Sequence, residues 1–439
     1  MKYTKLILTA ALLFLAVTLG AQTLRDNVSI YVNHWDGLYE KGELVKVWAD
    51  VKAVPEGDVW LYVYKACYRK NPQKSLIQLK KGKNVLFEET VDETVQYVFE
   101  LTDGVKPGEF KDPGAKGNVW AGFVVDPNGF EVGFEEPADV RAFWKKNIRE
   151  MRREKIQAQI TKDETKGGLR TYHVDINCVG PAPCRAYVSY PADAEKKSLP
   201  IILFLHSAGS PGAPSKASVA ESYAKMVEGG ALAMDLNAHG MLDDMPDEFY
   251  AELNRGELNG YSSREPADKD DYYFKWMLLR AQRALDYLCS NPLWDGKHVI
   301  VTGTSQGGLQ SAFLAGIDRR VTTAVLTVPA GLDQGAHLKG RESSWPNTMS
   351  KFPESTVANS PYFDPAVFLK YTKADIWCEI GLYDFTCPAA NLFATLNTVK
   401  TAKTIITYQR PHSVQKGLNK LHKPVDELRV QAIRDAAVR

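Results

Sequence analysis

The sequence predicts an α/β protein in which a small β-sandwich precedes a larger domain with a mostly parallel, helix-covered sheet. Three observations lead to this prediction. Residues 24–134 carry apolar side chains at every second position and show no convincing helical period. From about Glu136 onward, strand and helix patterns alternate, as in parallel βαβ units. The length of 439 residues suits two or three domains, each with its own core.

The first residues have the order of a secretory signal. Lys2 and Lys5 precede an apolar run from Leu6 to Leu19, and the small residues Gly20 and Ala21 follow. The run is shorter than the ~20 residues that a membrane helix needs, and a buried helix is the alternative interpretation. We therefore expect residues 1–21 to be removed and the mature chain to be exported, periplasmic or secreted, with no membrane span after signal removal.

The predicted β-sandwich covers residues 22–135 and is expected to be immunoglobulin-like. Val45, Val47, Ala49 and Val51 alternate with more polar neighbours, as in a strand with one buried face. Residues 119–134 resemble a hairpin, with a turn at residues 126–129. Several short strands with turn signals between them are typical of a sandwich.

One predicted strand of the sandwich is apolar on both faces. Val59, Leu61 and Val63 occupy one face, and residues 60, 62 and 64 place Trp, Tyr and Tyr on the other. An apolar second face must be covered. Either it docks against the rest of the chain, or it forms a platform on which sugar rings stack.

The second predicted domain covers residues 136–439. An amphipathic helix opens it, because Val140, Phe143, Trp144, Ile148 and Met151 recur at helical spacing. The predicted strands are 185–190, 201–205, 232–236, 298–302, 323–328, 376–380 and 404–408. The predicted helices are 216–227, 270–289, 306–317 and 389–400.

Composition excludes several classes of partner and site. Lysine plus arginine (54) nearly equals aspartate plus glutamate (53), and a net charge of +1 argues against nucleic-acid binding and against attraction to an anionic membrane. The six cysteines are too few for a disulfide scaffold in a chain of this length. Cys178 and Cys184 either pair across a proline-containing turn or are small buried side chains. No His/Cys cluster has metal-ligand spacing, so we expect no metal and no cofactor.

The strongest motif is G-x-S-x-G at residues 303–307, directly after an apolar strand and directly before a helix. In this context the motif is a nucleophile elbow, which predicts an α/β-hydrolase fold with Ser305 as the nucleophile. The small flanking residues let strand and helix approach each other. The amides at the start of the helix point to where negative charge develops during acyl transfer.

A serine nucleophile needs a base, and the base needs an orienting acid; in this fold the chain order is Ser, acid, His. His412 follows the predicted strand 404–408 and is the predicted base. His337 lies in a polar excursion before the late strands, and His422 falls at the start of the terminal helix. Asp384 follows the strand 376–380 and is the predicted acid; an ordinary turn aspartate is the alternative.

The oxyanion of the tetrahedral intermediate needs two donors. The first predicted donor is the backbone N–H of Gln306, directly after the nucleophile. The second is expected from the loop after the strand 201–205, where we predict the N–H of Ala208. His206 in the same loop is interpreted as a residue that shapes the loop, with a ligand or base role as the alternative.

These residues resemble the acetyl xylan esterase/cephalosporin C deacetylase family, carbohydrate esterase family 7. The resemblance runs from Pro137 to the C-terminus and rests on the opening helix 137–144, the loop 204–207, the elbow 303–308 and the segment 381–388. It implies deacetylation of small esters and acetylated sugars through Ser305, Asp384 and His412, with backbone donors at Ala208 and Gln306. It also implies a ring-shaped homo-oligomer.

The sequence departs from the family pattern in three places. Residues 237–239 are Asn-Ala-His where the family has Arg-Gly-Gln, Ser413 replaces a glutamate, and Ala208 replaces an aromatic residue. These departures leave the triad unchanged and bear on xylan specificity and on the oligomer. The leading hypothesis is an exported serine esterase that removes acetyl groups from carbohydrates. A serine peptidase of the same superfamily and a non-catalytic carbohydrate-binding protein are the alternatives.

Overall fold

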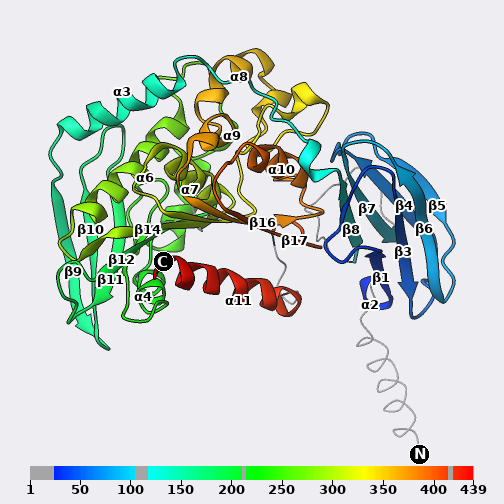
Figure 1. Cartoon of the computed structure of the whole chain (residues 1–439), viewed down its shortest axis with the longest axis horizontal. Helices are drawn as coiled ribbons and strands as arrows, with labels where there is room; N and C mark the ends of the chain where they lie inside the picture. The colour runs from blue at the N-terminus through cyan, green and yellow to red at the C-terminus, as the bar shows by residue number, and fades with distance from the viewer. Residues whose placement is uncertain (1–23, 104–116, 210–213, 414–418, 439) are drawn as a thin grey trace, which may run out of the picture.

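The computed structural model describes residues 24–103, 117–209, 214–413 and 419–438. The predicted signal at residues 1–21 lies outside them. Among the described residues, no helix is both long and apolar enough to cross a membrane. In the N-terminal part, strands are the main regular elements of the described residues 24–103 and 117–129, and this part is called the β module below. The part that follows contains one large sheet between helices (Figure 1).

The β module contains two sheets that share one core. The first has the order β1-β3-β6 and the second the order β2-β8-β7-β4-β5. A short helix, α2 (Leu24–Asn27), precedes them, and the strands are β1 (Val28–Val32), β2 (Leu38–Tyr39), β3 (Glu43–Val51), β4 (Val59–Lys65), β5 (Gln73–Ile77), β6 (Gly82–Val91), β7 (Val95–Asp103) and β8 (Val119–Val125). The predicted alternation holds, because Val45, Val47 and Ala49 are buried together with Phe99 and Phe123 of the other sheet. The immunoglobulin-like character and the domain boundary at residue 135 stay predictions.

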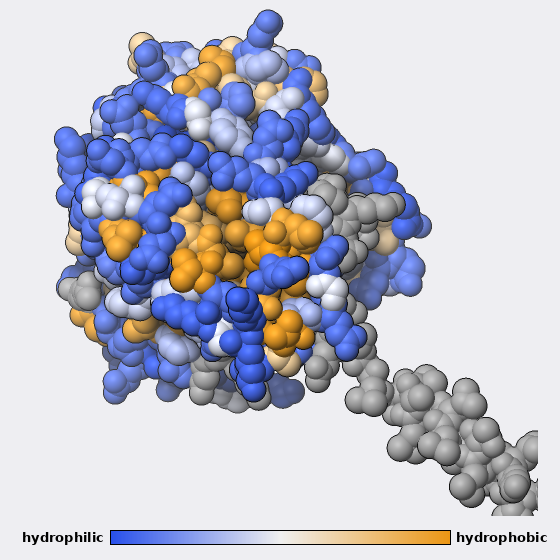
Figure 2. All heavy atoms as spheres, turned by 90° about the vertical axis from the view of Figure 1, so that its right-hand side faces the viewer, coloured by the Kyte–Doolittle hydropathy of each residue, from blue (hydrophilic) through white to orange (hydrophobic). Residues whose placement is uncertain are grey.

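The β-module side of the molecule has an apolar surface region. Figure 2 views this side and shows apolar side chains gathered at its centre, framed by polar ones. The edge strands β5 and β6 carry the exposed Leu76 and Val85. Leu86 and Phe87 of β6 are only partly buried against the core of the module. Apolar side chains are therefore left exposed or only partly covered along β5 and β6.

The predicted hairpin after β8 is wrong. β8 is followed by the short 3-10 helix η1 (Pro127–Gly129), and residues 130–134 form no strand. Phe130 and Phe134 are instead buried in the core of the second part, and the Gly133 N–H donates to Asp333 Oδ1 at 2.7 Å. The apolar alternation there reflects anchoring of the connecting segment, which a hairpin pattern imitates.

The docking interpretation of the aromatic strand is confirmed. Tyr62 and Tyr64 of β4 are buried in a cluster with Trp120 of β8 and Phe385 of the second part. Trp60 lies at the border of this cluster and is partly buried. The second apolar face of β4 is thus covered by the rest of the chain.

The second part has the predicted α/β architecture, with a nine-stranded sheet in the order β17-β16-β15-β14-β12-β13-β11-β10-β9. Strands β12 to β17 pair in parallel, and β9 to β11 are antiparallel to their neighbours. The strands are β9 (Ala158–Lys166), β10 (Leu169–Ile176), β11 (Cys184–Pro191), β12 (Leu199–Leu205), β13 (Leu232–Leu236), β14 (Trp294–Thr304), β15 (Thr323–Thr327), β16 (Asp375–Gly381) and β17 (Lys403–Tyr408). The helices longer than six residues are α3 (Val140–Arg153), α4 (Ala217–Ala224), α5 (Asp247–Arg255), α6 (Tyr273–Ser290), α7 (Gln306–Ile317), α8 (Pro353–Asn359), α10 (Ala389–Asn397) and α11 (Asn419–Ala436).

Both faces of the sheet are covered, as its uninterrupted apolar strands require. Val299 and Val301 of β14 face the core that contains α3, α6, α7 and α10, and Ile300 between them faces the opposite core with α11 (Figure 1). All six cysteines lie within the described residues and are free, so Cys178 and Cys184 do not pair. The fold places the carboxyl ends of the parallel strands together at one edge.

Candidate active site

Ser305 occupies a strained turn between β14 and α7. Its φ of 56° and ψ of −119° lie outside the regions that residues with a side chain favour. The Ser305 N–H donates to the Thr327 carbonyl at 3.0 Å, and the Ser305 carbonyl accepts from Ala330 N–H at 2.9 Å. These bonds to β15 and to the segment after it hold the turn in place.

The glycines around Ser305 are required by close approach to β12. A Cβ on Gly307 would lie 1.9 Å from the Leu205 carbonyl oxygen, and one on Gly303 would lie 2.6 Å from the same atom. Such distances are far below van der Waals contact, so a larger residue would push β12 away from the elbow. The pattern G-x-S-x-G is therefore dictated by packing at both of these positions.

The structure brings Ser305, His412 and Asp384 together in one hydrogen-bonded chain. His412 Nε2 lies 2.8 Å from Ser305 Oγ, and His412 Nδ1 lies 2.8 Å from Asp384 Oδ2. Asp384 follows β16 and is fully buried, His412 follows β17, and Ser305 is 7% exposed. The parallel strands β14, β16 and β17 deliver the three side chains to the same edge of the sheet.

Asp384 is fixed by two further bonds. Its Oδ1 accepts from the N–H groups of Thr386 and Cys387, each at 2.8 Å. Burial lowers the pKa of His412, but the buried Asp384 carboxylate more than offsets this, and the net effect raises the pKa. The carboxylate therefore stabilises the protonated imidazole and fixes Nδ1 as the protonated nitrogen of the neutral ring.

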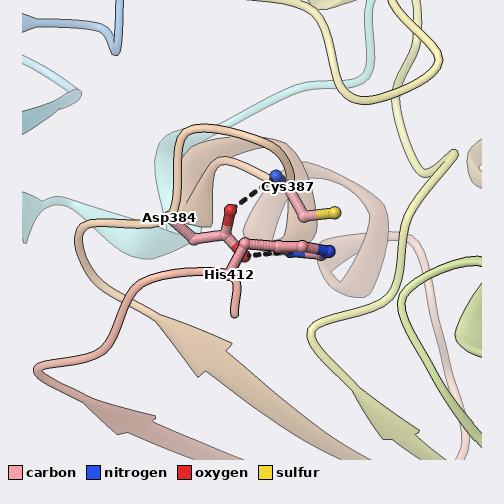
Figure 3. Close-up of side chains that lie close together, drawn as sticks. All are labelled: Asp384, Cys387 and His412. Carbon is pink, nitrogen blue, oxygen red and sulfur yellow. Dashed lines mark hydrogen bonds and ion pairs between the residues drawn. The ribbon is translucent and has the colours of Figure 1, made fainter. Parts of the chain in front are cut away.

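Cys387 lies beside this pair, as Figure 3 shows. Asp384, Cys387 and His412 offer three ligand atoms within 4.8 Å of one another. However, both oxygens of Asp384 and Nδ1 of His412 are already engaged in the bonds described above. Burial also raises the pKa of the Cys387 thiol, and a neutral thiol is a poor ligand. The arrangement is therefore a hydrogen-bonded Asp384–His412 pair with a neighbouring thiol.

The loop that carries His412 is anchored to a buried carboxylate. Arg410 Nη2 donates to the His412 carbonyl at 3.3 Å, and Arg410 Nη1 donates to Glu379 Oε2 at 3.3 Å. Glu379 of β16 is fully buried and also accepts from Arg429 of α11 at 2.8 Å. Helix α11 is thus linked to the loop of His412 through Arg429, Glu379 and Arg410.

The predicted oxyanion donors come from segments that a single hydroxyl connects. Gln306 is the first residue of α7, and Ala208 lies exposed in the loop after β12. The Tyr261 hydroxyl donates to Gln306 Oε1 at 2.6 Å and accepts from Gly209 N–H at 3.3 Å. The sequence did not single out Tyr261, which belongs to a short 3-10 helix (Tyr261–Ser263) far from the elbow in the chain.

The altered segment 237–239 packs next to this connection. His239 is buried, its ring centroid lies 4.7 Å from that of Tyr261, and its Nδ1 lies 2.5 Å from the Tyr273 hydroxyl. Burial and the nearby Arg280 lower the pKa of His239 to about 3. A neutral, buried imidazole there supports Tyr261 by packing.

The other histidines that the sequence analysis weighed have different surroundings. His206 Nε2 pairs with the fully buried Asp235 at 2.5 Å, which agrees with a role in shaping the loop after β12. His337 lies in the 3-10 helix η4 (Ala336–Lys339), with its ring against Tyr68 of the β module. His422 belongs to α11.

Comparisons with known proteins agree on one family. The model of the acetyl xylan esterase (AXE1) family matches residues 130–423. The curated acetyl esterase Axe7A of Xylanibacter ruminicola is 28% identical over 392 residues, which cover 87% of this chain and 85% of that protein.

Two solved structures show the same fold. The acetyl xylan esterase from Paenibacillus sp. R4 superposes with a TM-score of 0.58 at 23% identity, over 70% of this chain and 98% of its own. Acetyl xylan esterase 1 from Thermoanaerobacterium sp. JW/SL YS485 gives a TM-score of 0.55 at 19% identity, over 70% and 97%. The similarity to these structures supports the α/β-hydrolase fold.

Proposed function

Because the chain belongs to the acetyl xylan esterase family and is a carboxylic ester hydrolase, we propose that it is an exported serine esterase that removes acetyl groups from carbohydrates. One observation carries the proposal: the chain of two 2.8 Å hydrogen bonds from Asp384 through His412 to Ser305 at a strained elbow. This is the constellation that acyl transfer through a serine needs.

In the proposed reaction, His412 Nε2 accepts the proton of Ser305 Oγ while the oxygen attacks the acetyl carbonyl carbon. The N–H groups of Gln306 and Ala208 stabilise the oxyanion that forms. His412 then gives its proton to the sugar oxygen, the bond between that oxygen and the acetyl carbon breaks, and the acetyl group is left as an ester on Ser305. A water molecule, deprotonated by His412, attacks this ester. The bond from the acetyl carbon to Ser305 Oγ then breaks, His412 returns the proton to Oγ, and acetate leaves.

The test is acetate release by the purified protein. We expect release from acetylated xylan and from small acetylated sugars, and no cleavage of peptide amides. The mass of the exported protein, expected to start near Gln22, is read from the same preparation. Cleavage of peptides without ester hydrolysis would favour the serine peptidase, and sugar binding without any hydrolysis would favour the carbohydrate-binding protein.

We expect Tyr261→Phe to lower kcat for p-nitrophenyl acetate about tenfold with little change in KM. The variant removes the hydroxyl that joins Gly209 to Gln306, so both proposed oxyanion donors can move. Losing one donor outright costs about 10²–10³-fold, and a displaced donor should cost less. The measurement is steady-state kinetics at several substrate concentrations.

Tyr250→Phe is the matched control. Tyr250 is equally buried, and its hydroxyl also bridges two loop segments, accepting from Met245 N–H and donating to the Leu242 carbonyl. Neither of these two hydrogen bonds involves the elbow or the loop after β12. Equal losses of kcat in both variants would show that Tyr261 acts through general stability.

A further inference from the structure

The loop that carries Asp384 lies between the sheet and the β module. Its two aromatic neighbours, Tyr383 and Phe385, both pack on the module: the Tyr383 ring stacks on Trp120 at 6.4 Å, and the Phe385 ring meets Tyr64 at 5.0 Å. Asp384 between them pairs instead with His412. The residues on either side of the acid are therefore held by a different part of the chain from the one that supplies the base.

Gln96 of β7 fastens both ends of this acid loop, residues 382–388. Its Nε2 donates to the Leu382 carbonyl at 3.1 Å, and its Oε1 accepts from Ala390 N–H at 2.9 Å. Gln96 is fully buried, and both partners are almost 300 residues away in the chain. One amide thus fixes the point where the loop leaves β16 and the point where α10 begins.

β8 holds the base loop, residues 409–413, by a second amide. Gly122 N–H donates to Gln409 Oε1, and Gln409 Nε2 donates to the Gly122 carbonyl, both at 2.8 Å. Gln409 stands three residues before His412. Gly122 also touches the acid loop, because a Cβ on it would lie 2.1 Å from the Leu382 carbonyl oxygen. Only glycine allows β8 to lie this close to both loops.

We propose that the β module positions the residues of the catalytic centre. Gln96 and Gln409 are the positioning residues, and they keep Asp384 and His412 in hydrogen-bonding geometry. The proposal rests on the proposed function of the triad. The physical reason is that the reaction tolerates little misplacement of its groups, since a shift of about 1 Å between reacting groups can cost about 10²-fold in rate. The acid and base loops belong to neighbouring strands, and the module ties both to one rigid pair of strands, β7 and β8.

The test compares Gln96→Met and Gln409→Met with Asn397→Leu in the full chain. Asn397 Nδ2 also donates two hydrogen bonds, to the Pro127 carbonyl of the module at 3.0 Å and to the Phe130 carbonyl of the connecting segment at 3.1 Å, but at the far end of α10. We expect the two glutamine variants to lose about 10–100-fold in kcat for p-nitrophenyl acetate, with KM within about twofold of wild type, and Asn397→Leu to keep its kcat.

A second measurement does not depend on activity. In protein labelled at histidine nitrogen, the downfield proton signal of His412 Nδ1–H reports its bond to Asp384, and we expect both glutamine variants to shift or broaden it. Gln96→Glu, which keeps the acceptor for Ala390 N–H, serves if Gln96→Met does not fold. An unchanged signal and unchanged kcat would overturn the proposal. If the two glutamine variants change the signal as expected but the wild-type protein hydrolyses no ester, only the proposed function is wrong.

Discussion

Ser305→Ala is expected to lower kcat for p-nitrophenyl acetate by at least about 10⁴-fold, because no other hydroxyl replaces the nucleophile of a serine triad. Only Oγ is removed, and Ala at φ 56° carries the same backbone strain as Ser. The unfolding temperature should therefore stay close to that of wild type. Steady-state hydrolysis and thermal unfolding of the same preparations provide the measurement.

Ser311→Ala is the control for this variant. Ser311 lies in α7, is fully buried like its surroundings, and donates to the Gly307 carbonyl at 2.9 Å. It should lose some stability through this bond and keep most of its activity. If Ser305→Ala retains more than a hundredth of the wild-type rate, another group attacks the ester and the triad assignment is wrong.

The site could be predicted because each of its residues has a local signal. Ser305 is marked by close packing, which forces glycine at 303 and 307. Asp384 and His412 each follow an apolar strand, and parallel strands bring such positions to one edge. The order of the residues in the chain then leaves few candidates for each role.

The residues that hold the site in place carry no such signal. Gln96 and Tyr261 act on partners about 290 and 45 residues away in the chain, and one glutamine or tyrosine in a strand or loop looks like any other. Strand β9 gives no sequence signal, because all nine of its residues are exposed and no apolar alternation marks it. The connection 130–134 imitates a strand, because buried side chains give the same alternation whether or not the backbone pairs.

Asp384→Asn is expected to reduce kcat about 10⁴-fold at neutral pH, as loss of the orienting carboxylate does in a serine triad. The structure gives the reason. Oδ1 of Asp384 accepts two backbone N–H bonds from Thr386 and Cys387, so the asparagine oxygen should take that place and its NH₂ should face His412 Nδ1. Nδ1 must then accept, and the proton of the neutral ring moves to Nε2, where it blocks transfer from Ser305 Oγ.

The same variant changes the pH dependence of its residual activity. His412 acts as a base only when neutral, so activity is present above its pKa and falls as the pH falls through it. The Asp384 carboxylate raises this pKa; without it, the acid limb of the kcat profile should move to lower pH. Asp235→Asn, which disrupts the buried pair with His206, should leave the position of the limb unchanged. A limb that stays in place in Asp384→Asn would mean that the group titrating in kcat is not His412, since the charge 2.8 Å from its Nδ1 would then have had no effect on it.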